Sequence, residues 1–214
     1  MSPSRTRMIG LAGALVAWNG AVAPTLPPRW LVPVHAALAA ALVRTTGAPL
    51  GLGPPTVGRG ARLGLAAAGA VATVVASSTA VPAIRRGMAQ RELPRPVSTW
   101  LLVRIPIGTV WSEEAAFRGA LGTVAAQALG PRWGRALQAT AFGLSHVADA
   151  RGAGDAVIGT VLVTAAAGWA FGWLYDRSGS LAAPMLAHLA INEAGAVAAL
   201  IVENQTSRLS VSSR

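Results

Sequence analysis

Long apolar tracts, separated by short loops that are rich in Gly, Pro and Arg, make up most of this chain. They span residues 8–23, 30–43, 63–82, 97–129, 133–147, 156–175 and 181–202. A helix needs about 20 apolar residues to cross a bilayer, and the third, sixth and seventh tracts reach that length. The first, second and fifth are shorter, so we expect them to extend, tilt or enter the bilayer only in part. The pattern predicts an all-α fold, a polytopic transmembrane helix bundle of about seven helices (six to eight).

The fourth tract is too long for one simple span, and Ser112, Glu113 and Glu114 interrupt its middle. Pro106 and Gly108 come just before the glutamates, so we expect a long tilted helix that kinks there and frees backbone groups. Helix breakers predict loops at residues 24–28, 47–60, 94–96, 130–131, 151–154 and 176–179. The polar residues 203–214 are expected to form a frayed tail.

The composition agrees with a membrane protein. Apolar residues make up 53% of the chain, charged residues make up 12%, and the mean hydropathy is +0.50, whereas a soluble domain carries about a quarter charged residues. The net charge of +10 comes from scattered arginines, so no nucleic-acid partner is expected. Loops that touch anionic lipid headgroups explain the excess more simply. The arginines divide evenly between two alternating sets of loops, so the positive-inside rule gives no orientation.

The absence of cysteine and the nature of the first apolar tract narrow the possible classes of protein. There is no cysteine, which excludes disulfides, thiolate catalysis and cysteine-ligated zinc. The N-terminus is similar to a signal peptide, because Arg5 and Arg7 precede an apolar run that ends in small residues. Pro24 fits poorly after a cleavage site, so we interpret the first tract as a retained helix. We expect an integral protein of a bacterial cell membrane, in contact with the lipid bilayer, and leave its oligomeric state open.

Ionisable side chains inside the apolar tracts are costly in lipid and are therefore candidates for function. Glu114 and Arg118 are four residues apart, so they share one face of a helix and can pair. Glu113 points about 100° away from Glu114, because each residue advances that far round a helix. One carboxylate can be held by Arg118 while the other is free to act as a base. A salt bridge that packs two helices explains one glutamate, but it does not readily explain the second.

Two further pairs have the same helical spacing. Phe142 and His146 close the fifth tract, and His188 and Asn192 share a face of the last tract. Each pair alone is explained equally well by a hydrogen-bond clamp between helices. Together with Glu113, they supply the carboxylate, imidazole and amide groups that activate water and stabilise an oxyanion.

The same groups raise the question of a metal. Glu113, His146 and His188 are candidate ligands for a divalent ion such as zinc, which suits two His and one Glu. The HExxH signature of zinc proteases is missing. The cofactor therefore stays open between none and a divalent metal.

Two other features concern the architecture. Gly168 and Gly172 form a small-xxx-small pair that lets helices approach closely. His35 stands alone among Ala and Leu, and we interpret it as structural or interfacial.

The motifs resemble those of the CPBP intramembrane proteases, a family that includes type II CAAX prenyl endopeptidases, lysostaphin-resistance-like proteins and bacteriocin-immunity relatives. The family pattern EExxxR, FxxxH and HxxxN stands here as Glu113 to Arg118, Phe142 to His146 and His188 to Asn192. The resemblance predicts a catalytic core over residues 97–202. Residues 1–96 match only in being hydrophobic and helical, and we expect one structural domain overall.

The resemblance implies a membrane-embedded endopeptidase that cleaves membrane-associated proteins or peptides. Glu113 would activate the attacking water with help from His146, and His188 and Asn192 would stabilise the oxyanion. The supporting residues would be Glu114, Arg118 and Phe142. The family has been described both as metalloproteases and as metal-independent glutamate-type proteases, and both remain open. The alternative is a non-enzymatic membrane protein of the bacteriocin-immunity or scaffold type, in which the same polar residues are helix clamps.

Overall fold

The fold is built from helices joined by short loops, and this computed structural model describes residues 2–212. In chain order the elements are α1 (Pro3–Ala17), η1 (Trp18–Val22), η2 (Ala23–Thr25), α2 (Pro28–Thr46), α3 (Thr56–Ser78), α4 (Pro82–Ala89), α5 (Val97–Thr99), η3 (Trp100–Trp111), η4 (Glu114–Leu121), α6 (Gly122–Leu129), α7 (Pro131–Ser145), α8 (Val147–Ala153), α9 (Val157–Ser178) and α10 (Ala182–Ser212). Every predicted apolar tract is mostly helical, and the described residues form no strand. The predicted all-α class is confirmed.

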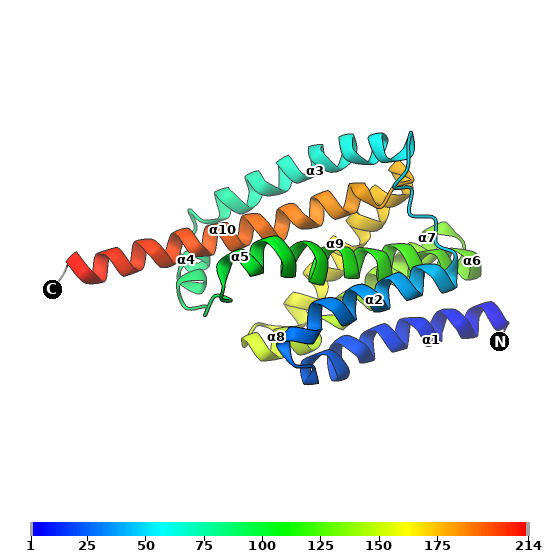
Figure 1. The fold of residues 1–214 in the computed structure, drawn as a ribbon, viewed down its shortest axis with the longest axis horizontal. Coiled ribbons are helices and arrows are strands. Elements are labelled where there is room, and N and C mark those ends of the chain that lie inside the picture. The colour runs from blue at the N-terminus through cyan, green and yellow to red at the C-terminus, as the bar shows by residue number, and fades with distance from the viewer. Residues whose placement is uncertain (1, 213–214) are drawn as a thin grey trace.

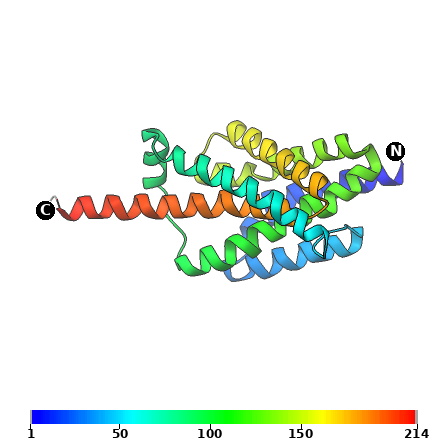
Figure 2. The same cartoon turned by 90° about the horizontal axis from the view of Figure 1, so that it is seen from above.

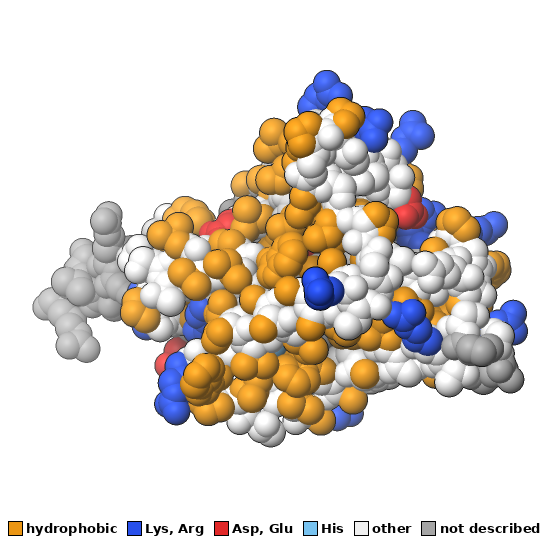
Figure 3. All heavy atoms as spheres, turned by 45° about the vertical axis from the view of Figure 1, so that its right-hand side comes forward, with side chains coloured by type: hydrophobic (Ala, Val, Ile, Leu, Met, Phe, Trp, Pro, Cys, Tyr) orange, Lys and Arg blue, Asp and Glu red, His pale blue; other side chains and the backbone are white. Residues whose placement is uncertain are grey.

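Several helices have the length and the surface of membrane spans. Four segments among the described residues are long and apolar enough to cross a bilayer, namely Ser4–Thr25, Thr56–Ser78, Val157–Ser178 and Ala182–Thr206. Leu102 and Ile158 have exposed fractions of 73% and 76%, and apolar side chains cover much of the face drawn in Figure 3. Such large apolar surfaces are suited to lipid rather than to water. The chain is a membrane protein.

The helices run roughly along one long axis, and the longest pair forms one side of the bundle. α3 and α10 lie side by side, and the last turns of α10 project beyond the other helices (Figures 1 and 2). A Cβ on Gly64 of α3 would lie 2.9 Å from the Cα of Ala183 in α10. This distance is shorter than real Cβ contacts, so the close approach of the two helices requires glycine there.

Several boundaries differ from the sequence expectation, and α3 and α9 extend into the loops predicted at residues 47–60 and 176–179. The short helix α4 occupies residues for which no helix is predicted, and α8 covers most of the loop predicted at residues 151–154. The tail is not frayed from Glu203 onward, because α10 stays helical to Ser212. Contacts with the segment around α4 account for the extension: Arg95 forms a 2.8 Å ion pair with Glu203, and Arg85 donates a hydrogen bond to Gln205. These contacts join distant parts of the chain, so the sequence near Glu203 does not predict them.

The fourth tract forms one continuous helix that is wound more widely than an α-helix for most of its length. η3 and η4 are π-helical, and Pro106 lies inside η3. Proline cannot donate a backbone hydrogen bond, and π turns are the usual accommodation of such irregularities near functional sites. The π winding begins at Trp100, ahead of Pro106 and Gly108, and the kink expected at these two residues stays a prediction. All eight residues of η4 are buried, and η4 contacts α1, α2, α7 and α9.

The predicted close approach at Gly168 and Gly172 brings α9 against α7. A Cβ on Gly168 would lie 2.9 Å from Cδ1 of Phe142, and a Cβ on Gly172 would lie 2.8 Å from Nε2 of Gln138. The space that these glycines leave is filled by side chains of α7. Phe142, which belongs to the second motif, is thereby pressed against the centre of the bundle.

We predict that Gly168→Ala destabilises the protein by about 1–3 kcal/mol, because the added methyl group overpacks the contact with Phe142. Thermal unfolding in detergent, followed by tryptophan fluorescence, measures the effect. Gly159→Ala on the same helix is the matched control, since its Cβ meets only an ordinary 3.8 Å contact. It should be neutral or stabilising by up to about 1 kcal/mol. Equal effects of the two substitutions would contradict the packing argument.

Candidate active site

Glu114 lies at the centre of the bundle, and its carboxylate joins two helices. The residue is fully buried, and its Oε1 is 2.7 Å from Nδ1 of His188 on α10. Its Oε2 is 3.3 Å from Nε of Arg118, one turn further along η4. The pairing of Glu114 with Arg118 that their spacing predicts is present. His188 adds a second partner from 74 residues away in the chain.

The guanidinium of Arg118 is held by aromatic rings as well as by Glu114. Its Cζ is 4.0 Å from the ring centre of Phe142 and 5.0 Å from that of Phe171. The side chain is completely buried, and a buried cation is strongly destabilising without compensation. Desolvated cation–π contacts contribute about 2 kcal/mol or more. Phe142 thus supports the buried ion pair.

Phe171 belongs to the site although no motif contains it. Its ring stacks on His188, with ring centres 5.0 Å apart and an interplanar angle of 24°. The chain has only three phenylalanines. The other two, Phe117 and Phe142, lie in the motif segments, and their ring centres are 5.1 Å apart. The rarity of phenylalanine is the one sequence signal that could have pointed to Phe171.

Glu113 has a different environment from Glu114, as the helical geometry predicts. Its side chain is 24% exposed, and its Oε2 is 3.8 Å from Nε2 of His188, which is longer than a hydrogen bond. Among the described residues, this buried oxygen has no hydrogen-bond partner. Because an ionised Glu114 can only accept, the hydrogen of its contact with His188 lies on Nδ1. Nε2 is then the atom that His188 presents to Glu113.

His146 lies at the junction of α7 and α8. Its Nδ1 is 2.8 Å from the carbonyl oxygen of Phe142, and the two ring centres are 4.7 Å apart. The Phe142 ring also lies 6.2 Å from that of His188, so one aromatic ring contacts both imidazoles. Within residues 2–212 no direct contact joins His146 to Glu113, and the water predicted between them stays a prediction. With Nδ1 at the backbone, Nε2 is the His146 atom left for chemistry.

Asn192 follows His188 by one turn of α10, and its Nδ2 donates to the His188 carbonyl oxygen at 3.1 Å. An amide group has two N–H donors, so one remains. Asn192 also lines a cavity of about 580 Å³ between α4, the segment that follows it, Trp100 and α10. This volume is in the usual range of ligand pockets, about 300–1,000 Å³.

His35, which we interpret from sequence as structural or interfacial, lies near Glu113 in the fold. It lines a small cavity together with Glu113, and its ring meets the edge of Trp18 at 5.9 Å between ring centres. Its Nε2 is buried and has no hydrogen-bond partner in the described part of the chain. Sequence spacing gives no sign of this placement, because α2 and η4 meet only through the tertiary fold.

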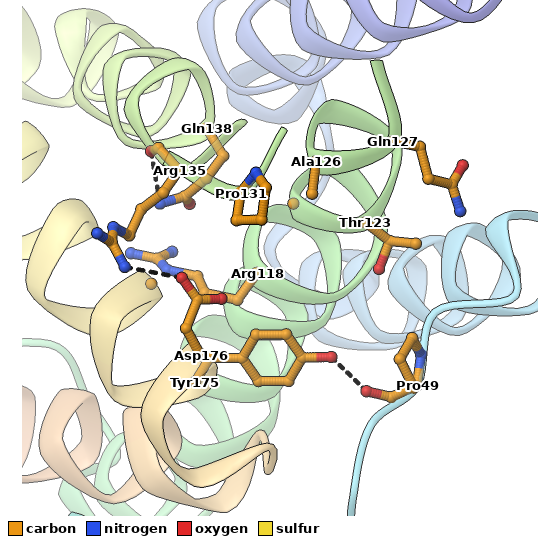
Figure 4. Close-up of a pocket in the computed structure, with 12 residues that line it drawn as sticks. Pro49, Arg118, Thr123, Ala126, Gln127, Pro131, Arg135, Gln138, Tyr175 and Asp176 are labelled. Atoms are coloured by element: carbon orange, nitrogen blue, oxygen red, sulfur yellow. Dashed lines mark hydrogen bonds and ion pairs between the residues drawn. The ribbon is translucent and has the colours of Figure 1, made fainter. Parts of the chain in front are cut away.

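A separate cavity of about 280 Å³ lies between α6, α7 and α9, and Arg118 is the predicted site residue in its wall (Figure 4). Arg135 and Asp176 form a 2.8 Å ion pair there, and the Tyr175 hydroxyl donates to the Pro49 carbonyl. These contacts tie α9 to α7 and to the loop before α3. The glutamate and histidine candidates do not line this cavity, so it is not where we place the chemistry.

The candidate metal ligands do not form a ligand set. Over the described residues, no group of three or more His, Cys, Asp or Glu side chains is arranged to hold a metal ion. Glu113, His146 and His188 therefore do not fit a shared ion in this geometry.

One comparison with protein families gives a match. A family model, the type II CAAX prenyl endopeptidase Rce1-like family, matches residues 95–194. This segment is Rce1-like. The Rce1-like segment contains all three motifs, which confirms the family predicted from them, and residues 1–94 lie outside it. Searches of curated proteins and of solved structures give no match. The Rce1-like family supports a protease that acts on membrane-associated substrates.

We predict that Arg118→Met destabilises the protein by about 3–5 kcal/mol, because it leaves a buried carboxylate without its cation. The double variant Glu114→Gln/Arg118→Met should recover part of this loss, since both charges are removed. Unfolding in detergent, followed by circular dichroism, provides the measurement.

The control is Arg91→Met, which removes an exposed arginine from its ion pair with Asp155. Exposed pairs contribute about 0–1 kcal/mol. An Arg118→Met variant as stable as this control would show that the buried pair does not hold the bundle together.

Proposed function

We propose that this chain is an intramembrane endopeptidase that hydrolyses peptide bonds by means of a water molecule activated by Glu113. The observation that carries the proposal is the position of His188 between two carboxylates, 2.7 Å from Glu114 and 3.8 Å from Glu113, inside an apolar bundle. The Rce1-like match over the same segment supports it. We keep the bacterial cell membrane as the expected location.

Glu113 is the general base. Its Oε2 is buried and free of hydrogen bonds among the described residues, so it can accept the proton of a water. The water oxygen forms a bond to the scissile carbonyl carbon, and the carbonyl electron pair moves onto oxygen. Nε2 of His146 assists by orienting the water or the leaving amine. A positioned base of this kind contributes about 10²–10⁴-fold to the rate.

His188 and Asn192 stabilise the oxyanion. Glu114 fixes the His188 ring through Nδ1, as a second carboxylate orients a catalytic imidazole. Nε2 is thereby presented to the site, and it donates to the oxyanion in the imidazolium form of the ring. Asn192 supplies the amide hydrogen that its own backbone contact does not use.

The reaction ends with cleavage of the C–N bond. The oxyanion re-forms the carbonyl group, and the leaving nitrogen takes the proton that Glu113 received from water. The products are a carboxylic acid and an amine, and Glu113 is returned to its ionised form. No step passes through a metal, because the donor groups do not form a ligand set.

The substrate is proposed to approach through the 580 Å³ cavity that Asn192 lines. This cavity can hold several residues of an extended peptide, and it places them beside Asn192. Its wall is largely apolar, and it also includes Arg91 and Glu92. A membrane-associated peptide with a polar end fits this mixture.

A clamp without catalysis is the second candidate, and one observation favours it. Glu114 forms an ion pair with Arg118 and a hydrogen bond with His188, as residues that only join helices would. The clamp does not account for Glu113, whose Oε2 has no hydrogen-bond partner in the described chain. The protease accounts for both glutamates.

We predict that Glu113→Gln and His146→Ala each lower peptide cleavage by at least about 100-fold while the protein stays folded. Purified protein in proteoliposomes is incubated with internally quenched fluorescent peptides, with and without a prenylated cysteine, and kcat and KM are measured for the best substrate. Activity should survive treatment with a metal chelator.

Asp149→Asn, which neutralises an exposed carboxylate on α8, is the control and should leave cleavage unchanged. Full activity of Glu113→Gln would refute the mechanism. If the wild type cleaves no peptide while the Glu113 and His146 variants unfold at lower temperature, the clamp is correct.

We further predict that Asn192→Ala lowers kcat by about 10²–10³-fold with little change in KM, because an oxyanion donor acts mainly in the transition state. Steady-state kinetics on the same peptide measure the two constants. A rise in KM at constant kcat would instead place Asn192 in ground-state binding of the substrate.

A further inference from the structure

Glu113 lines a cavity that is much smaller than the proposed substrate cavity. Its volume is about 30 Å³. It lies where η1 and α2 meet the long helix of residues 97–129, which we call the central helix. A water needs about 10–15 Å³ of such space, so the cavity holds about two waters and no peptide residue. We call it the Glu113 pocket, and its polar or aromatic lining is Trp18, Asn19, His35, Ser112, Glu113 and Phe117.

The polar groups of the Glu113 pocket come from three separate elements. Asn19 lies in η1, His35 lies in α2, and Glu113 is at the start of η4. η1 is a single π turn at the end of α1, and such turns often occur at functional sites. A buried water makes about three hydrogen bonds, and an amide, an imidazole and a carboxylate supply the donors and acceptors for them.

Two buried polar atoms around this pocket lack a hydrogen bond among the described residues: Nε2 of His35 and Oε2 of Glu113. An unsatisfied buried polar atom costs about 1–3 kcal/mol, so two of them beside one cavity call for a common partner. Water is the partner whose size the pocket fits. The edge-on contact with Trp18 fixes the orientation of the His35 ring.

We propose that the Glu113 pocket holds the hydrolytic water and that His35 is a positioning residue, which hydrogen-bonds this water through Nε2 and keeps it against Oε2 of Glu113. The proposal rests on the proposed function and adds a residue from outside the Rce1-like segment. His35 forms no covalent bond and exchanges no proton with the substrate. The proton of the water still passes to Glu113, so the balance of the reaction is unchanged.

The kinetic test compares two substitutions at one position. His35→Leu keeps the bulk and removes the hydrogen bond, so kcat should fall by about 10- to 100-fold at constant KM, as for a misplaced reactant. His35→Gln places an amide near the position of Nε2 and should restore most of the activity. An unchanged kcat in His35→Leu, or equal defects in the two variants, would overturn the proposal in favour of simple packing.

A second measurement does not depend on cleavage. The chain has three histidines, so ¹⁵N-imidazole spectra of the whole protein in detergent are assignable with His35→Gln as reference. Glu113→Gln should shift the His35 ring resonances, because the two side chains share the pocket water. Asp149→Asn is the control and should leave them in place.

The two measurements separate failure of the inference from failure of the proposed function. If the wild type cleaves no peptide but the His35 resonances respond to Glu113→Gln, the pocket is supported and the protease is not. If the resonances do not respond, the pocket proposal is overturned whether or not the protein cleaves peptides.

Discussion

Glu114 is fully buried among apolar helices, where an ionised carboxylate is stable only beside cations or strong hydrogen-bond donors. Arg118 meets one of its oxygens from the same helix, and His188 meets the other from α10. The contact with His188 fixes where α10 can lie against the central helix. The glycines of α9 then let Phe142 reach the guanidinium of Arg118. The placement of several helices thus follows from the need to compensate one charge.

This compensation also explains why the chain carries two adjacent glutamates. Glu114 is occupied on both oxygens, and it can act only by holding its partners in place. Glu113 lies on another side of the helix, keeps part of its surface exposed and meets His188 only at 3.8 Å. A base must be held near its target without being neutralised by a close cation. Glu113 meets this requirement, whereas Glu114 does not, because its partners Arg118 and His188 lie closer.

The features predicted from sequence are those that depend on local spacing. Tract length predicts the helices, and i,i+4 geometry predicts the pairing of Glu114 with Arg118. Sequence spacing cannot tell which glutamate His188 will contact, because that contact spans 74 residues. The same limit applies to Phe171, to His35 and to the extension of α10, which makes an ion pair and a hydrogen bond with a distant segment. The motifs predict which residues matter, and the tertiary fold decides how they meet.

Hydrolysis inside an apolar bundle requires water and substrate to reach the scissile peptide bond by separate routes. A single wide opening to water would expose the buried ion pair of Glu114 and Arg118. The structure has two cavities that differ by more than tenfold in volume, about 30 Å³ beside Glu113 and about 580 Å³ beside Asn192. His188 contacts Glu113 on one side and precedes Asn192 by one turn on the other. In the proposed mechanism it therefore stands where the two routes converge. In this mechanism the helices that precede the Rce1-like segment also have a functional role, because α2 and η1 line the small cavity that holds the water.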